Sequence, residues 1–422
     1  MQKLNLKDPL RRSVPIGIVI FGIVLGLLAA PHPALADLRF TPSLTVSEAY
    51  DSNVFIGGGA DKDDFVTTVS PGISATYRGR PLEGTLSAGL SVSSYAKHSN
   101  LNYVSATGSL NVDLTQLVRR LDKRARLQIA DTVLYTPELP AFVTNTVGLN
   151  PFATGIQPQR VRSLSNTVSL TGGYTLTPRV DLNAGYSYSI LSFGNTIGAP
   201  PQTGAPGQTS LFGTTVHNAS AGPNVKLTTT DTLNLQALYS NTDFNGGAGS
   251  FQTEGGTVGL THLFSPQLTA TVAGGATLIS PSNRVAPLAN LSVSWREKNT
   301  TTTFSYARSV SPSFIIAATA VESNLVSLAV THGFTERLTG TAGANYARSS
   351  SAASLTSRTS GSSGSNLTFD SYGADFSLRY SIRRWLSGAF LYSHTHFNQG
   401  FTGATSSFSR ELVTISLTAS WL

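Results

Sequence analysis

The sequence contains no cysteine. That absence excludes disulfides, thiolate metal sites, iron–sulfur clusters and the attachment of c-type haem. Charge is also scarce, because Asp, Glu, Lys and Arg make up 12% of the chain, whereas about 25% is usual in soluble domains. After the first residues, no apolar run reaches the roughly 18 residues that a membrane-spanning helix requires. These absences disfavour a redox protein, a helical membrane protein and an ordinary soluble domain.

Residues 1–36 have the pattern of a secretory signal peptide. An apolar run over Val14–Ala30 is followed by Ala34-Leu35-Ala36, a small-x-small cleavage site, and is preceded by the basic residues Lys3, Lys7, Arg11 and Arg12. We expect cleavage before Asp37, so that residues 37–422 form the mature domain. A retained membrane helix is the less favoured alternative, because the run is short.

The high isoelectric point, about 9.6, is partly a property of that leader. Four of the 29 Lys and Arg residues and one of the 22 Asp and Glu residues lie within it, so the remainder carries a net charge of only +4. No basic stripe is interleaved with stacking aromatic residues. We therefore expect no nucleic-acid partner.

The main positive signal is strict alternation of apolar and polar residues. From Leu82 to Ser93 the even positions are apolar or small and the odd positions are mostly polar. The same pattern occurs over Tyr103–Leu114, Asp181–Ile190 and Ser371–Tyr380. Because successive side chains of a strand point to opposite sides, these segments predict two-faced β-strands.

The connections between the predicted strands distinguish a membrane barrel from a soluble β-sandwich. Short turns, such as Thr115–Arg124, alternate with longer loops, such as Pro137–Val161, Phe193–Thr214, Ser280–Ala286 and Gln399–Ser407. Bacterial barrels alternate short periplasmic turns with longer outer loops. The sequence therefore predicts an all-β fold, a transmembrane antiparallel up-and-down β-barrel of about 18 strands, with 16 to 18 compatible, in the outer membrane.

Aromatic residues lie near the ends of the predicted strands, as expected for side chains at two membrane interfaces. Those beside short turns are Tyr77, Phe264, Trp295, Phe334 and Tyr380, and those beside long loops are Tyr95, Tyr103, Tyr135, Tyr239, Tyr306 and Tyr346. The last strand alternates from Val413 to Trp421. Its terminal aromatic is similar to the signal that barrel-assembly machinery recognises in its clients, although Leu422 follows it.

Two segments fit the pattern poorly. Asp131 falls on the apolar face of its strand, beside Ile129 and Val133. A carboxylate facing lipid in mid-bilayer is costly, so we expect a bulge or a different register there. The strand over Trp385–Phe397 can be assigned to either face.

The start of the predicted barrel resembles a known family. The segments concerned are Thr45–Phe55, Asp64–Ile73 and Tyr77-Arg78. They resemble outer-membrane β-barrel porins of a family that includes barrels of the PEP-CTERM system and of exopolysaccharide loci. The resemblance covers about the first sixty residues of the predicted mature chain. It implies an outer-membrane barrel of a kind often linked to polysaccharide export or to envelope biogenesis, and it supplies no catalytic residues.

No constellation of catalytic residues stands out, and we expect neither an enzyme nor a cofactor. A barrel lipase or acyltransferase would need Ser and His together at a lipid-facing rim, which a sequence does not reveal. His394 and His396 lie on one strand face and could bind a metal, but a rim pair without metal is favoured. The acidic loop Asp61–Asp64 could bind Ca²⁺, although a solvated outer loop, bridged through divalent ions to lipopolysaccharide, is favoured.

The interpretation that remains is a pore. The predicted lumen-lining residues are Glu83, Asp113, Asp181, Asn183, Asp375 and Arg379. A wall of hydroxyl groups with few charges suits polar solutes such as sugars, and the loops Pro137–Val161 and Phe193–Thr214 could fold inward as a constriction. Cations expected at the periplasmic mouth are Arg78, Arg80, Arg119, Arg120, Lys123, Arg124, Arg383 and Arg384.

These cations could attract anionic solutes, bind phospholipid head groups or bind a partner. A conduit for polar solutes or exopolysaccharide is therefore the first hypothesis. A plugged structural or assembly barrel of an envelope or polysaccharide export system is the alternative. Expected partners are outer-membrane lipid, lipopolysaccharide, the assembly machinery and polysaccharide-export proteins.

Overall fold

The structure is a computed structural model that describes residues 37–55, 63–79, 82–137, 160–196, 211–247, 249–312, 319–354, 367–401 and 404–421. The predicted leader, residues 1–36, lies outside this part. The strands are β1 (Asp37–Asp51), β2 (Asp64–Arg78), β3 (Glu83–Tyr95), β4 (Tyr103–Asp113), β5 (Ala125–Thr136), β6 (Val161–Thr177), β7 (Val180–Thr196), β8 (Thr214–Lys226), β9 (Asp231–Phe244), β10 (Ser250–Ser265), β11 (Leu268–Ser280), β12 (Arg284–Glu297), β13 (Thr300–Pro312), β14 (Thr319–Gly333), β15 (Leu338–Ser354), β16 (Leu367–Arg383), β17 (Leu386–Phe401) and β18 (Ala404–Ser420).

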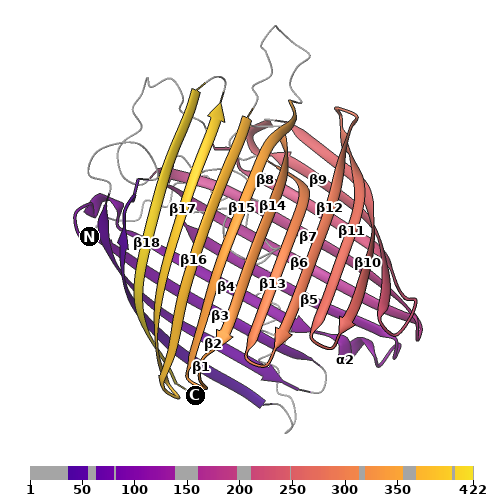
Figure 1. The fold of residues 1–422 in the computed structure, drawn as a ribbon, viewed down its shortest axis with the longest axis horizontal. Coiled ribbons are helices and arrows are strands. Elements are labelled where there is room, and N and C mark those ends of the chain that lie inside the picture. The colour runs from indigo at the N-terminus through magenta and orange to yellow at the C-terminus, as the bar shows by residue number, and fades with distance from the viewer. Residues whose placement is uncertain are drawn as a thin grey trace.

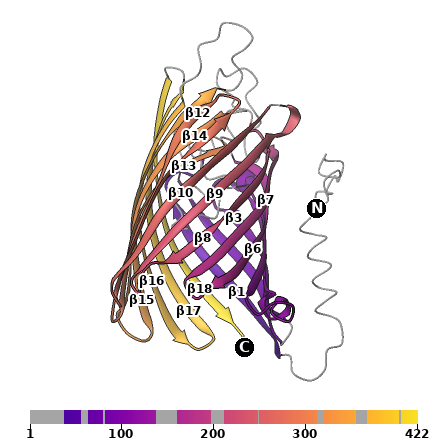
Figure 2. The same ribbon diagram turned by 90° about the vertical axis from the view of Figure 1, so that its right-hand side faces the viewer.

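These strands form one closed sheet. Each strand pairs antiparallel with the next one in the chain, and β1 also pairs with β18, which completes an 18-stranded ring. Figures 1 and 2 show strongly tilted strands around a wide interior. Closure gives every described strand a neighbour on both sides, as a sheet in a bilayer requires. The predicted fold class and strand number are thus confirmed.

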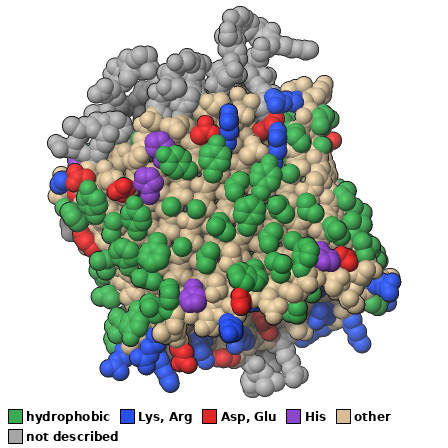
Figure 3. Space-filling view, viewed as in Figure 1, with side chains coloured by type: hydrophobic (Ala, Val, Ile, Leu, Met, Phe, Trp, Pro, Cys, Tyr) green, Lys and Arg blue, Asp and Glu red, His purple; other side chains and the backbone are tan. Residues whose placement is uncertain are grey.

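The alternating residues separate the two faces of the wall. Large apolar side chains that are exposed on the outside include Val46, Ile73, Val92, Val272 and Ile415. Outward aromatic residues near the short turns include Phe264, Trp295, Phe334, Tyr380, Trp385 and Trp421. In Figure 3 hydrophobic side chains cover the middle of the visible face, and charged ones gather toward its two margins. This is the apolar band with aromatic borders that lipid requires.

Several predicted connections are shorter than expected. The β11–β12 connection is residues 281–283, and the β17–β18 connection is residues 402–403, so the predicted long loops Ser280–Ala286 and Gln399–Ser407 are wrong. Strands can extend beyond the membrane because pairing also satisfies their backbone groups in water. The predicted turn Thr115–Arg124 contains a short helix, α2 (Thr115–Val118). Among the residues that the structure describes, no helix is long and apolar enough to cross a membrane.

The two difficult strands are resolved by their neighbours. Asp131 keeps an unbroken register with both β4 and β6, so the predicted bulge or register change is wrong. Its carboxylate is only 4% exposed and accepts a hydrogen bond of 2.6 Å from Nδ2 of Asn166 on β6. A donor on the next strand therefore compensates for the buried charge. In β17, pairing with β18 places Phe390, Tyr392, His394 and His396 on the outer face, opposite Ile415 and Val413 and their neighbours.

Candidate functional site: the barrel interior

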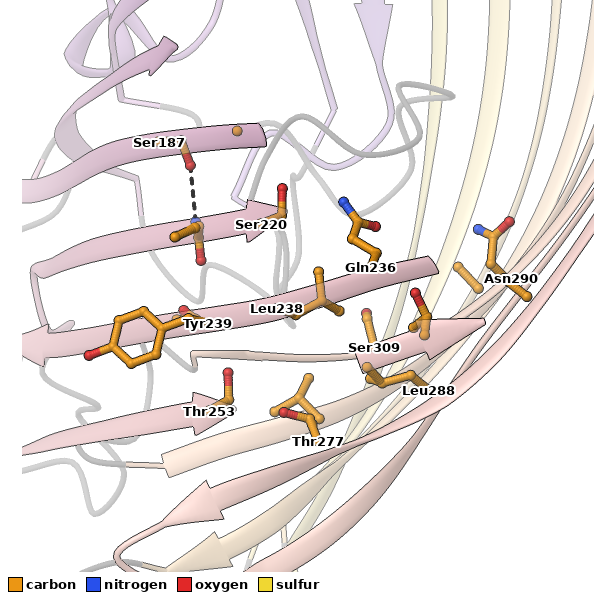
Figure 4. Close-up of a pocket in the computed structure, with 18 of the residues that line it drawn as sticks. Ser187, Ser220, Gln236, Leu238, Tyr239, Thr253, Thr277, Leu288, Asn290 and Ser309 are labelled. Atoms are coloured by element: carbon orange, nitrogen blue, oxygen red, sulfur yellow. Dashed lines mark hydrogen bonds between the residues drawn. The ribbon is translucent and has the colours of Figure 1, made fainter. Parts of the chain in front are cut away.

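The inner wall is lined mainly by hydroxyl and amide side chains. A cavity of about 750 Å³ follows the wall from β6 to β13. Figure 4 shows Ser187, Ser220, Gln236, Asn290 and Ser309 around it, contributed by five different strands. These groups face inward because they alternate with the apolar outer positions, so the same period that makes the lipid face also makes a polar interior.

Charged groups gather on one side of this wall, near the short turns. Glu83 and Asp113 are directly paired between β3 and β4. Arg126 approaches Asp181, with 3.5 Å between Nη2 and Oδ1. A second cavity of about 430 Å³ contains Glu83, Asp113, Arg126 and Asn183 among its lining residues. Four of the six predicted lumen residues, namely Glu83, Asp113, Asp181 and Asn183, thus lie in one sector, and acids outnumber bases among the groups named here.

The other two predicted lumen residues lie on β16. Asp375 is paired with Gly343 and Ser393, and Arg379 is paired with Thr339 and Ala389. Arg379 donates a long hydrogen bond, 3.4 Å, to Oγ of Ser387. Both share the inward parity of β16, but they belong to a different part of the wall from the Glu83 sector. The structure does not bring all six residues together.

The predicted mouth cations lie at the short-turn end of the barrel. Arg78 ends β2, Arg119 and Arg120 follow α2, Lys123 and Arg124 precede β5, and Arg383 and Arg384 lie at the β16–β17 turn; Arg80 lies outside the described residues. Figure 3 shows Lys and Arg side chains along this lower margin. The pKa of Asp122, beside Arg124, is lowered because the Arg124 N–H and the Tyr174 hydroxyl donate to its carboxylate.

The inner face differs sharply between its two ends. Toward the long loops, inward residues on most strands are almost fully buried, including Asp64, Ser189, Thr214, Thr242, Ile279, Ala286, Ser349 and Phe369, and we call this set the buried inner ring. Toward the turns, inward residues such as Glu83, Asn111, Gln128 and Gln236 are exposed. In the described part of the chain, the inner wall is therefore exposed at the turn end and covered by packed side chains at the loop end.

Arg160 is one of the side chains that pack against the inner wall at the loop end. This residue immediately precedes β6, yet its Nε donates to the carbonyl oxygen of Val54, at 2.7 Å, beyond the end of β1. Its guanidinium also donates to the Tyr95 hydroxyl and lies 4.9 Å from the centre of that ring. Asp51, 4.0 Å from Arg160, accepts hydrogen bonds from Arg410 on β18. The end of the β5–β6 connection is thus held inside, against β1, β3 and β18.

Sequence reasoning did not identify Arg160, because an isolated arginine after a Pro- and Gly-rich loop has no distinguishing pattern. Tyr95 was expected among the interfacial aromatic residues, but its position in β3 places its side chain on the inner face, where it is 4% exposed.

The fully buried Asp64 accepts hydrogen bonds from the backbone of Lys97 and from Nδ1 of His98. The expectation of a solvated acidic loop is therefore wrong for Asp64, while Asp61 and Lys62 lie outside the described residues.

The two imidazoles of the His394–His396 pair have different neighbours. His394 lies 3.6 Å from Glu411, whereas His396 bonds to Ser409 and Asn398. Within the described ranges, no group of three or more His, Asp or Glu residues could hold a metal ion. The neighbouring groups of these two imidazoles are therefore not a metal-ligand set.

The closed ring, the apolar outer band and the polar interior together decide the class of protein. The chain is an outer-membrane β-barrel. Only closed barrels and helices satisfy the backbone within lipid, and barrels of this construction occupy outer membranes. The localisation expected from the sequence is confirmed.

No family model matches this outer-membrane barrel, and no curated protein matches it. Solved structures similar to it include the siderophore receptor PirA from Pseudomonas aeruginosa, with 11% identity and a TM-score of 0.45, over 93% of this chain and 81% of that one. OccK2 (OpdF) from the same organism has 11% identity and a TM-score of 0.45, over 92% and 98%. The outer membrane protein OpdK, also from Pseudomonas aeruginosa, has 12% identity and a TM-score of 0.43, over 91% and 99%.

Proposed function

We propose that this barrel is a passive pore for polar, weakly charged solutes such as sugars. The observation that supports the proposal is the inner wall between β6 and β13, where Ser, Thr, Asn and Gln surround a cavity of about 750 Å³. Hydroxyl and amide groups can replace the hydration of a sugar without trapping it by charge. No covalent step is required, and selection would occur where the lumen narrows toward the buried inner ring.

The solute class can be refined on two grounds. The Glu83 sector places the carboxylates of Glu83, Asp113 and Asp181 beside the guanidinium groups of Arg119 and Arg126, and this mixed charge favours neutral molecules over strongly charged ones. The resemblance of the first strands to barrels of exopolysaccharide loci and the PEP-CTERM system favours a neutral oligosaccharide as the cargo. We also propose that the barrel contacts polysaccharide-export proteins.

Two measurements test the pore. Purified, folded protein in planar bilayers should give discrete conductance steps, and liposomes containing it should swell in iso-osmotic solutions of neutral sugars. The swelling rate should fall as the sugar grows from a monosaccharide to a trisaccharide. Folded protein that yields neither conductance nor swelling would refute the proposal.

A second function is favoured by the buried inner ring, which encircles much of the loop end. A lumen closed there would suit a structural or assembly barrel that binds partners through its periplasmic cations. Replacing Arg119, Arg120, Lys123 and Arg124 by Gln should then abolish capture of a periplasmic partner and leave conductance unchanged. We also propose lipopolysaccharide and the assembly machinery as partners, because every barrel of this class must be inserted and surrounded by lipid.

A further inference from the structure

A serine, a histidine and an asparagine are hydrogen-bonded in series on the outside of the barrel. Oγ of Ser409 on β18 lies 2.7 Å from Nδ1 of His396 on β17. The other ring nitrogen of His396, Nε2, lies 3.1 Å from Oδ1 of Asn398. Ser409 and His396 are direct partners in the β17–β18 register, so both side chains leave the wall on the same face.

The two contacts fit one tautomer of the imidazole. If Nε2 bears the hydrogen, it donates to Oδ1 of Asn398, and Nδ1 accepts a hydrogen bond from the Ser409 hydroxyl. The Tyr372 ring stacks on His396, with 4.8 Å between ring centres and 22° between planes. A nucleophile, its base and a group that orients the base are three of the parts of a nucleophilic hydrolytic site.

The location of the three residues matches an ester-bearing substrate. They lie on the face that carries Ile415 and Leu417, which are exposed to lipid. His396 lies ten positions after Leu386, which is at the turn end of β17. At about 3.4 Å per residue and a tilt of about 40°, this offset corresponds to a height of roughly 26 Å along the membrane normal. The apolar band is about 25 Å tall. His396 therefore lies at its outer border, where acyl chains join their head groups.

Other polar side chains lie beside Ser409, His396 and Asn398 but form their hydrogen bonds and ion pairs elsewhere. His394 faces Glu411 on the next strand, at 3.6 Å. Asp370 pairs with Asn398 across β16 and β17 and accepts a hydrogen bond from the Tyr346 hydroxyl. An incidental contact between a hydroxyl group and an imidazole would need only the Ser409–His396 bond, without the second bond from His396 to Asn398. Here both ring nitrogens of His396 have a polar partner, and the Tyr372 ring restrains the imidazole.

We propose that Ser409, His396 and Asn398 form a lipid-facing acyl-ester hydrolase site, with Ser409 as nucleophile, His396 as general base and Asn398 as positioning residue. The substrate class is a carboxylic ester of a lipid in the surrounding leaflet. Ser409 Oγ bonds to the ester carbonyl carbon while Nδ1 of His396 takes the hydroxyl proton. The ester C–O bond then breaks, and that proton leaves with the alcohol. Water hydrolyses the acyl-serine, so one ester and one water give one acid and one alcohol.

A covalent probe tests the nucleophile without knowledge of the substrate. Folded protein in lipid vesicles is treated with a fluorophosphonate, which labels activated serine hydroxyls, and the labelled residue is found by peptide mass spectrometry. We expect label on Ser409, and none in Ser409→Ala. Ser407→Ala is the matched control, because it removes a hydroxyl two residues away on the same strand and face; it should label normally. His396→Ala should label about 10²-fold more slowly or worse.

Substrate assays then identify the lipid. Vesicles of diacyl phosphatidylethanolamine, of its diether analogue and of lipid A are supplied separately, and released fatty acid is quantified. Release from one ester lipid, absent from the diether and from Ser409→Ala, supports the proposal and names the source. Wild-type protein whose folding is verified by heat-modifiable gel mobility, yet which shows neither labelling nor fatty-acid release, overturns it.

Asn398 is tested by rescue. Asn398→Ala should lower kcat about 10²-fold or more with little change in KM, because the imidazole loses its orientation rather than its substrate contact. Asn398→Asp still offers an oxygen to Nε2 and should recover most of kcat. Equal losses in both variants would assign Asn398 a merely structural role. Since this site is on the outer face, conductance through the interior should not change in any of these variants.

Discussion

The contacts of Arg160 with Val54 and Tyr95 give the sharpest test of whether this side chain narrows the interior. Arg160→Ala removes a side chain that is 2% exposed, together with its hydrogen bond to the Val54 carbonyl and its contacts with Tyr95. A hydrogen bond from a charged donor contributes about 1.5–3 kcal/mol, and a cation–π contact contributes about 0.5–2 kcal/mol. We take about 3 kcal/mol as the combined loss, which corresponds to roughly a hundredfold shift between held and released states.

The assay is single-channel recording in planar bilayers. If the contacts of Arg160 narrow the lumen, Arg160→Ala should raise the mean conductance and add current fluctuations between levels. Arg162→Ala is the matched control, because it removes the same charge two residues later from an exposed position. It should behave as the native protein does. A folded Arg160→Ala variant with native conductance and native noise would show that this contact obstructs nothing.

Three further predictions concern the wall. Gly275→Ala should lower the free energy of unfolding by about 1–3 kcal/mol, because a Cβ there would lie 2.0 Å from the backbone oxygen of Gly256 on the adjacent strand β10. Gly274→Ala is the control, because its Cβ would meet no atom within 4 Å, and it should unfold in urea at the native midpoint. Equal midpoints for the two variants would contradict this. Asn166→Leu should lower the free energy of unfolding by about 1.5–3 kcal/mol, because the carboxylate of Asp131 loses its side-chain donor. A loss under about 0.5 kcal/mol would refute that role. Glu83→Gln should move the reversal potential in a KCl gradient toward lower cation preference; an unchanged potential would exclude Glu83 from the ion path.

The barrel itself follows from the sequence because period two is a property of any strand between lipid and water. In β18, Val413, Ile415, Leu417 and Ala419 alternate with Thr414, Ser416 and Thr418, and no other structure separates them so cleanly. Turn positions were less predictable. Beyond the apolar band the pattern weakens, and polar residues suit a paired strand in water as well as a loop. Residues 399–407 were therefore expected to be a loop, although β17 and β18 continue through most of them.

Contacts between strands were not predictable, because they depend on register. Asp131 was anomalous in the sequence, but its partner Asn166 is thirty-five positions away, and only the β5–β6 pairing brings the two together. The same holds for Ser409 and His396, which no spacing rule connects. Parity along a strand assigns a residue to a face, as it did for Glu83 and Asp181. It does not say which residue on the adjacent strand lies beside it.

The pairing of β1 with β18 has a consequence for biogenesis. Asp51 and Arg410 are separated by 359 positions and meet at this junction, as do the hydroxyl groups of Thr45 and Thr418. Contacts of such large separation form slowly, because a long loop must close first. β18 must therefore be synthesised before β1, which already pairs with β2, can pair on its other side. Until then, both terminal strands expose unpaired amides to water or lipid, and the nascent chain depends on being held apart from other unfinished copies.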